Sequence, residues 1–180
     1  GVVLMAGGGT LANDAVAAQL AARQRFARDG KPGLVLVNGE FGLRLLDHAR
    51  RWQLNAVPLH AEWGCAFEAT QVSQAIAGHR AAWVWATACE TSTGVRNDTS
   101  ALRQACREQG AALCLDGVSA VGLARFDMVG VKLASAVSGK ALGAAAGLAL
   151  VLHDGALAPP GSLPRCLDLA TYEAAEGLPY

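Results

Sequence analysis

The chain has 180 residues, of which 52% are hydrophobic and 17% charged, so it can form one domain with a sizeable buried core. Its 15 basic and 15 acidic residues cancel, which argues against nucleic acid or an acidic membrane surface as a partner. The five cysteines form no Cys-x-x-Cys pair and no apolar run is long enough to span a bilayer, so we expect a cytoplasmic protein with reduced thiols and no metal site.

Apolar runs and helical patterns alternate along the chain. After the first apolar run, Ala12, Val16 and Leu20 recur at helical spacing. The ranges predicted as strands are 4–6, 33–38, 56–60, 81–87, 112–116, 128–134 and 147–152, with helices between the first five. Strands that are apolar throughout are typical of a mostly parallel sheet buried on both faces. We therefore predict one α/β domain over residues 1–180, a three-layer αβα sandwich.

In such sheets, ligands bind outside the carboxyl ends of the strands. The glycine-rich turn from Gly7 to Thr10 follows the first strand and opens the first helix. Its backbone N–H groups and the positive helix end suit a phosphate, although a tight strand-to-helix turn explains the glycines equally well. A dinucleotide fingerprint is not supported, because Ala12 stands where the last glycine is required.

Two further loops allow both a structural and a functional interpretation. Phe41, after the strand at 33–38, either packs on a flat aromatic ligand or belongs to the core. The hydroxyl-rich stretch from Glu90 to Gly94 follows the strand at 81–87 and is either a solvated turn or part of a site. The four histidines share no metal-ligand spacing, so we interpret them as structural.

An aspartate and a lysine provide the chemically most specific signals. Asp116 ends an apolar strand, where a carboxylate either caps a turn or pairs with a positive ligand group. Lys140 is the one charged residue in the stretch 134–147, and a desolvated lysine suits an amine nucleophile. A Walker loop is not supported, because Ala134 and Ala141 replace its leading glycine and its Ser/Thr. With the glycine-rich turn, this pair suggests a pyridoxal phosphate site.

Five motifs in order resemble those of the class V aminotransferases. They are Gly8-Gly9-Thr10, Asn38-Gly39-Glu40-Phe41-Gly42-x-Arg44, Glu90-Thr91-Ser92-Thr93-Gly94-Val95, Asp116-x-Val118-Ser119-x-x-Gly122 and Ser138-Gly139-Lys140-Ala141-Leu142. The chain looks most like the branch with alanine–glyoxylate (serine–pyruvate) and 2-aminoethylphosphonate aminotransferases, from Leu4 to Leu152. The resemblance implies the large domain of fold type I, and a homodimer with active sites at the subunit interface.

The resemblance also implies pyridoxal 5'-phosphate as the cofactor and a role for each motif. Lys140 matches the lysine that forms a Schiff base with the cofactor and moves a proton, and Asp116 matches the carboxylate that pairs with the pyridinium nitrogen. Phe41 and Val118 match the residues on the two faces of the cofactor ring. The other matched positions are Gly8, Gly9, Thr10 and Gly139 near the phosphate and Thr91 near the phenolic oxygen. The implied reaction moves an amino group from an amino acid to a keto acid by a ping-pong mechanism.

The sequence departs from the family pattern in two ways. Many relatives have a serine at the position of Gly8 and a glutamine at the position of Gly139, so two phosphate donors are missing. Family members are also longer, with an N-terminal arm and a small C-terminal domain, so we interpret residues 1–180 as an incomplete large domain. The alternatives are a non-catalytic or truncated remnant with weak or no cofactor binding, and a desulfurase or lyase of the same class.

Overall fold

The computed structural model describes residues 1–26, 30–123 and 125–175. Seven strands in these ranges form one sheet: β1 (Val2–Ala6), β2 (Gly33–Val37), β3 (Ala56–His60), β4 (Trp83–Thr87), β7 (Ala112–Asp116), β8 (Val131–Val137) and β9 (Leu148–His153). The helices are α1 (Gly9–Phe26), α2 (Glu40–Arg51), α3 (Ala69–His79), α4 (Thr99–Gln109), the short η1 (Arg165–Leu167) and α5 (Leu169–Ala174). Two short strands, β5 (Cys89–Glu90) and β6 (Val95–Arg96), form a separate hairpin.

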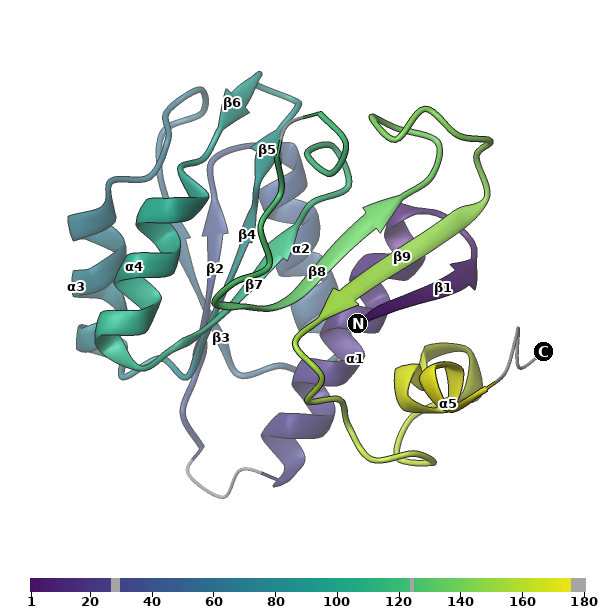
Figure 1. The fold of residues 1–180 in the computed structure, drawn as a ribbon. Helices are drawn as coiled ribbons and strands as arrows, with labels where there is room; N and C mark the ends of the chain where they lie inside the picture. The colour runs from purple at the N-terminus through teal and green to yellow at the C-terminus, as the bar shows by residue number, and fades with distance from the viewer. Residues whose placement is uncertain (27–29, 124, 176–180) are drawn as a thin grey trace.

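The sheet has the order β1-β9-β8-β7-β4-β2-β3. Its central strands pair in parallel, and β9 runs antiparallel to both of its neighbours. Helices α1 and α2 cover one face of the sheet, and α3 and α4 cover the other (Figure 1). The predicted three-layer αβα sandwich with a mostly parallel sheet is therefore confirmed.

Burial follows the position of each strand in the sheet. Every residue of β2 and β4 is buried, whereas β1 at one edge alternates between exposed and buried side chains.

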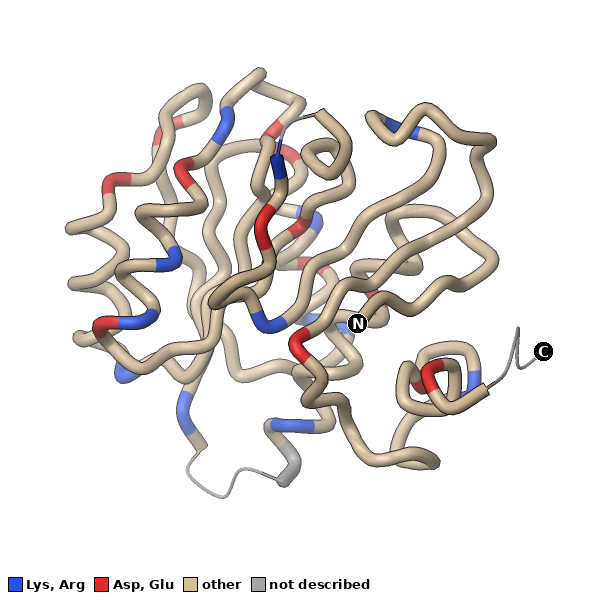
Figure 2. The backbone as a smooth tube through the Cα atoms, in the orientation of Figure 1, with Lys and Arg blue, Asp and Glu red and all other residues tan. Residues whose placement is uncertain are grey.

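Basic and acidic positions are interspersed along the backbone (Figure 2). In the part of the chain that the structure describes, no helix combines the length and apolar character that crossing a membrane would require.

The predicted strand at 128–134 begins three residues too early, because a turn precedes β8. The side chain of Asp127 accepts a hydrogen bond from the N–H of Val129 at 2.9 Å, and Gly130 has a positive φ of 74°. The N–H of Val131 then donates to the carbonyl of Met128 at 2.9 Å, which closes the turn. The apolar residues at 128 and 129 therefore precede the strand. The helix α5 was not predicted.

The carboxyl ends of the parallel strands bring the predicted site residues to one edge of the sheet. The glycine-rich turn follows β1, α2 starts after β2, Asp116 ends β7, and Lys140 lies in the loop after β8. Alanines on the buried face of α1 let this helix pack closely on β8 and β9. This packing fixes the start of α1 next to the ends of the neighbouring strands.

The start of α2 lies against the end of β2, and Gly42 makes this approach possible. A Cβ atom at Gly42 would lie 2.8 Å from the Cα of Val37 and 2.9 Å from the carbonyl oxygen of Leu36. Both neighbours are backbone atoms, so neither can rotate away as a side chain would. The glycine therefore sets how closely the first turn of α2, with Phe41, approaches the sheet.

We expect Gly42→Ala to destabilise the fold and Gly78→Ala, the matched control in α3, to stabilise it. The first change overpacks a backbone contact, which costs about 1–3 kcal/mol. Gly78 is exposed and a Cβ there meets no atom within 4 Å, so alanine gains up to about 1 kcal/mol of helix propensity. Urea unfolding of the two variants measures both effects. Equal changes in both would contradict a steric role for Gly42.

Candidate active site

A cavity of about 180 Å³ opens at the carboxyl edge of the sheet. Its walls come from the starts of α1 and α2, the turn after β7 and the loop after β8. The lining residues are Gly9, Thr10, Asn13, Phe41, Arg44, His48, Cys89, Asp116, Val118, Ser119 and Lys140. Six of the predicted site residues thus line one cavity. The other three, Gly8, Thr91 and Gly139, do not line it, and their cofactor contacts remain predictions.

Asp116 is buried at the base of this cavity, with 6% of its surface exposed. Its Oδ1 accepts a hydrogen bond from the N–H of Val118 at 2.9 Å, and its Oδ2 accepts one from Nδ2 of Asn13 at 2.9 Å. Burial raises the pKa of Asp116 above its ordinary value, and the donors on Asn13 and Val118 lower it in part. The carboxyl group therefore caps the turn after β7 and still lines the cavity.

The start of α1 has the features of an anion-binding site. The carbonyl of Gly8 accepts a helical hydrogen bond from the N–H of Ala12 at 3.2 Å, and no acidic residue occupies the first turn. A Cβ at Gly9 would lie 3.0 Å from Cγ2 of Val118, so glycine lets the helix start come close to the turn after β7. Backbone N–H groups at such a helix start bind phosphate groups well.

Lys140 is exposed, so the expectation of a desolvated lysine is wrong for this chain. All residues from 139 to 148 are exposed, and the apolar character of this loop comes from small alanines and glycines. Ser138 ties the base of the loop, because its Oγ donates to the carbonyl of Ala145 at 2.6 Å and accepts from the N–H of Leu148 at 3.2 Å. The loop presents Lys140 at the open side of the cavity.

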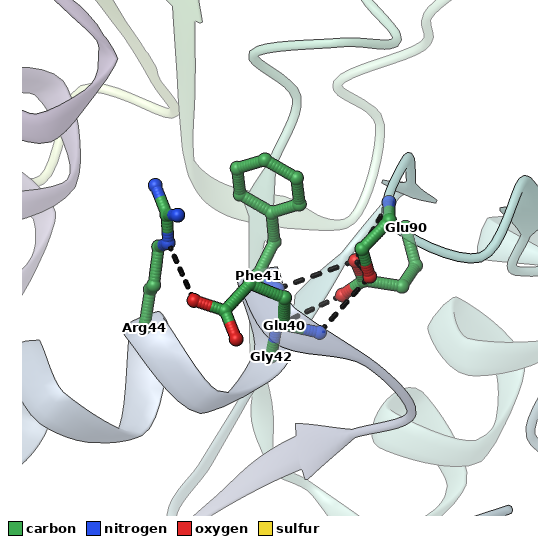
Figure 3. A network of polar contacts seen from close by, with 6 residues as sticks. Glu40, Phe41, Gly42, Arg44 and Glu90 are labelled. Atoms are coloured by element: carbon green, nitrogen blue, oxygen red, sulfur yellow. Dashed lines mark hydrogen bonds and ion pairs between the residues drawn. The ribbon is translucent and has the colours of Figure 1, made fainter. Parts of the chain in front are cut away.

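The start of α2 is held by Glu90, which is fully buried. Its carboxylate accepts hydrogen bonds from the N–H of Phe41 at 3.2 Å and from the N–H of Gly42 at 2.9 Å (Figure 3). The hydroxyl of Ser92 donates to the same carboxylate at 2.5 Å. A Cβ at Gly39 would lie 2.5 Å from Cγ of Glu90, so the glycine before α2 makes room for this side chain. Glu90 thus acts as the cap of α2 and fixes the position of Phe41.

Phe41 lies on the cavity wall and is only partly buried. The guanidinium of Arg44 lies over its ring, 4.9 Å from the ring centre, and Nε of Arg44 pairs with Glu40 at 3.1 Å (Figure 3). A core phenylalanine would be enclosed on all sides, whereas this ring borders an open space. The position supports the interpretation that Phe41 packs on a ligand.

Sequence reasoning missed several groups at this site. His48, interpreted as structural, lines the cavity, and its Nδ1 lies 2.8 Å from Oδ1 of Asp14. Asn13 is a buried amide among the mostly apolar buried residues of α1, and that break in the apolar pattern is the signal that could have drawn attention to it. The sequence left two interpretations for the loop that contains Glu90, a solvated turn or part of a site. In the structure the carboxylate of Glu90 caps the start of α2.

The residues present fit pyridoxal phosphate. The cavity combines a buried carboxylate that suits a ring nitrogen, a helix start that suits a phosphate, an aromatic face and a primary amine. Within the described ranges, no group of three or more His, Cys, Asp or Glu side chains is arranged to hold a metal ion. The fold and the site therefore define a cofactor-binding α/β domain.

Comparison with known proteins identifies the family. Residues 2–159 match the family Aminotransferase class-V, so the chain belongs to it. It is 33% identical over 165 residues to the L-aspartate–glyoxylate aminotransferase of Paracoccus denitrificans, covering 84% of this chain and 42% of the relative. It is 32% identical over 171 residues to the 2-aminoethylphosphonate–pyruvate transaminase of Pseudomonas aeruginosa, covering 93% and 44%.

Solved structures agree with this family. The crystal structure of an alanine–glyoxylate aminotransferase from Nostoc sp. superposes with a TM-score of 0.75 at 26% identity, covering 98% of this chain and 43% of that protein. Membership implies pyridoxal phosphate as the cofactor. The chain spans less than half the length of each of these three relatives.

We expect Glu90→Ala to destabilise the protein by about 1–3 kcal/mol, because it removes the acceptor of two N–H donors of α2, the buried one of Gly42 and the partly buried one of Phe41. The amides of Phe41 and Gly42 should also exchange faster with deuterium. The matched control is Glu40→Ala, which removes an exposed ion pair with Arg44 worth at most about 1 kcal/mol. Urea unfolding and amide exchange provide the measurements. Similar losses for both variants would refute the capping role.

Proposed function

We propose that residues 1–180 form the large, cofactor-binding domain of a pyridoxal phosphate-dependent aminotransferase. Such an enzyme moves an amino group from an amino acid to a keto acid. The observation that carries the proposal is the shared cavity of Asp116 and Lys140, because these two groups perform the two roles that the chemistry requires. The aminotransferase names of the relatives described above support it.

Several residues of the cavity have a task in this reaction. Pyridoxal phosphate supplies an electron sink for a substrate that loses a proton from its Cα. Asp116 would hold a proton on the ring nitrogen, and Nζ of Lys140 would take the proton from the substrate Cα and deliver it to the aldehyde carbon of the cofactor. Phe41 and Val118, which line the cavity, would hold the cofactor ring between them and exclude water. The N–H groups at the start of α1, with the hydroxyl of Thr10, bind the phosphate.

The names of the relatives support a substrate class. The aspartate enzyme and the 2-aminoethylphosphonate enzyme take glyoxylate and pyruvate as acceptors, and both are small 2-keto acids. We extend the proposal to a small 2-keto acid as the acceptor of this protein.

The proposal also includes a homodimer in the cytoplasm. The site is open on the side of Lys140, where residues 139–148 are exposed, and a second subunit would close it. All five cysteines are free, which is typical of a reducing compartment. Oligomeric state is measured by light scattering of the purified protein.

The test of the cofactor site is covalent trapping. We expect the purified chain to form a yellow adduct with pyridoxal phosphate, which borohydride fixes on Lys140 and peptide mass mapping locates. Lys140→Ala should lose the adduct. The control Lys132→Ala, which removes a lysine paired with Asp154 at 2.7 Å, should keep it.

Three outcomes separate the alternatives. An adduct retained in Lys140→Ala would overturn the assignment of the lysine. An adduct seen only in a longer chain would mean that this domain needs further segments to bind the cofactor. No adduct in either would favour the non-catalytic remnant.

A second prediction concerns the missing phosphate donors. A Cβ at Gly8 meets no atom within 4 Å, so Gly8→Ser adds a hydroxyl without strain and should tighten pyridoxal phosphate binding by roughly tenfold. A Cβ at Gly139 would lie 2.7 Å from Cβ of Ala146 and 2.9 Å from its Cα, so Gly139→Gln should bring no such gain. Titration by absorbance compares the two variants. Unchanged affinity in Gly8→Ser would show that other groups already saturate the phosphate.

A further inference from the structure

A chain of buried hydrogen bonds ends on Asp116. The hydroxyl of Ser135, in β8, donates to Oδ1 of Asn13 at 2.7 Å, and Nδ2 of Asn13 donates to Oδ2 of Asp116 at 2.9 Å. The three side chains come from β8, α1 and β7, and 7% or less of each is exposed. Asn13 also lines the cavity beside Asp116. The amide of Asn13 therefore connects the hydroxyl of Ser135, inside the sheet, with the carboxylate of Asp116, which lines the cavity.

The hydroxyl of Ser135 determines which way the amide points. An asparagine side chain has a donor and an acceptor end of nearly equal shape, and its partners decide the orientation. Because Ser135 donates to the oxygen of Asn13, the NH₂ group is directed at Asp116. An ionised carboxylate can only accept hydrogen bonds, so this orientation favours the charged form of Asp116.

Other charged and titratable groups also face Asp116. The charge of Glu90, from β5, opposes ionisation of Asp116. Arg44 and His48, from α2, and Lys140, after β8, line the same cavity. Asn13 donates a side-chain hydrogen bond to the carboxylate of Asp116 and Val118 donates a backbone one, and hydrogen bonding by the hydroxyl of Ser135 also lowers the pKa of Asp116, by less than that of Asn13. The amide is thus the side chain with the most immediate influence on this carboxylate.

We propose that Asn13, held by Ser135, is a positioning residue that keeps Asp116 oriented and ionised toward the cavity. The inference rests on the proposed function, because it deepens the role of Asp116 as partner of the ring nitrogen. Asn13 itself does not touch a reacting atom in this scheme. Its contribution is to offset the burial of a carboxylate that would otherwise favour its neutral form.

The test measures the titration of Asp116 in the chain without cofactor. Carboxyl carbons of ¹³C-labelled aspartates are followed by NMR against pH, and Asp116→Asn identifies the signal of Asp116. Asn13→Leu replaces the amide with an apolar side chain of similar size. In this variant we expect the pKa of Asp116 to shift upward, because the hydrogen-bond donor is lost while the burial of Asp116 remains. Ser135→Ala should shift this pKa in the same direction by a smaller amount, because the amide keeps its donor but loses its fixed orientation, and the hydroxyl's own hydrogen bonding toward Asp116 is lost as well.

Gln19→Leu is the matched control. Gln19 is a buried amide on the same helix, and its oxygen accepts from the N–H of Ala158 at 2.7 Å, away from the cavity. An upward shift in Asn13→Leu and Ser135→Ala, with none in Gln19→Leu, supports the proposal. Unchanged titration in the Asn13 and Ser135 variants overturns it, and so does an equal shift in the control. If circular dichroism shows that Asn13→Leu does not fold, Asn13→Ala replaces it, and the pKa of Asp116 in that variant is judged by the same criterion.

This experiment separates the inference from the proposed function. The titration is measured without pyridoxal phosphate, whereas the trapping on Lys140 requires the cofactor. A shifted titration with no adduct would leave the positioning role of Asn13 intact and refute cofactor binding by this chain. An adduct with unchanged titration would support the function and overturn the role of Asn13.

Discussion

The site depends on the burial of one carboxylate in the middle of the sheet. Asp116 ends β7, which lies between β8 and β4, so water has little access to it. A buried carboxylate without donors is strongly unfavourable, and the surrounding elements must therefore supply hydrogen bonds. The turn after β7 gives the N–H of Val118, and α1 gives the amide of Asn13. The position of α1 on the sheet and the shape of that turn are thus both tied to Asp116.

A second buried carboxylate distinguishes the two helix starts at the cavity. Glu90 accepts two N–H groups of α2 and so neutralises the positive end of that helix from within the protein. The first turn of α1 contains no acidic residue. The two helices therefore offer different surfaces to a ligand: α2 contributes the ring of Phe41, and α1 contributes free dipole and N–H groups for an anion. This difference agrees with a ligand that has an aromatic part and a phosphate.

The sequence was sufficient for the α/β class and for most of the cavity. Apolar strands place their carboxyl ends at one edge, and motif order then assigns Asp116, Lys140 and Phe41 to that edge. The roles of Asn13 and Glu90 could not be predicted. Asn13 contacts a carboxylate 103 positions away, and no local pattern encodes such a distance. The error over the environment of Lys140 has a compositional cause, because alanine and glycine are apolar by type yet form an exposed loop here.

The contact between Gly9 and Val118 links two segments that are far apart in the chain. A single added methyl group at position 9 would press on the branched side chain at position 118, only 3.0 Å away. The free energies of substitutions at the two positions are therefore not additive, since the volume that one position loses becomes available to the other. A library that varies both positions together would therefore reach combinations of side-chain volume that a library varying either position alone would miss.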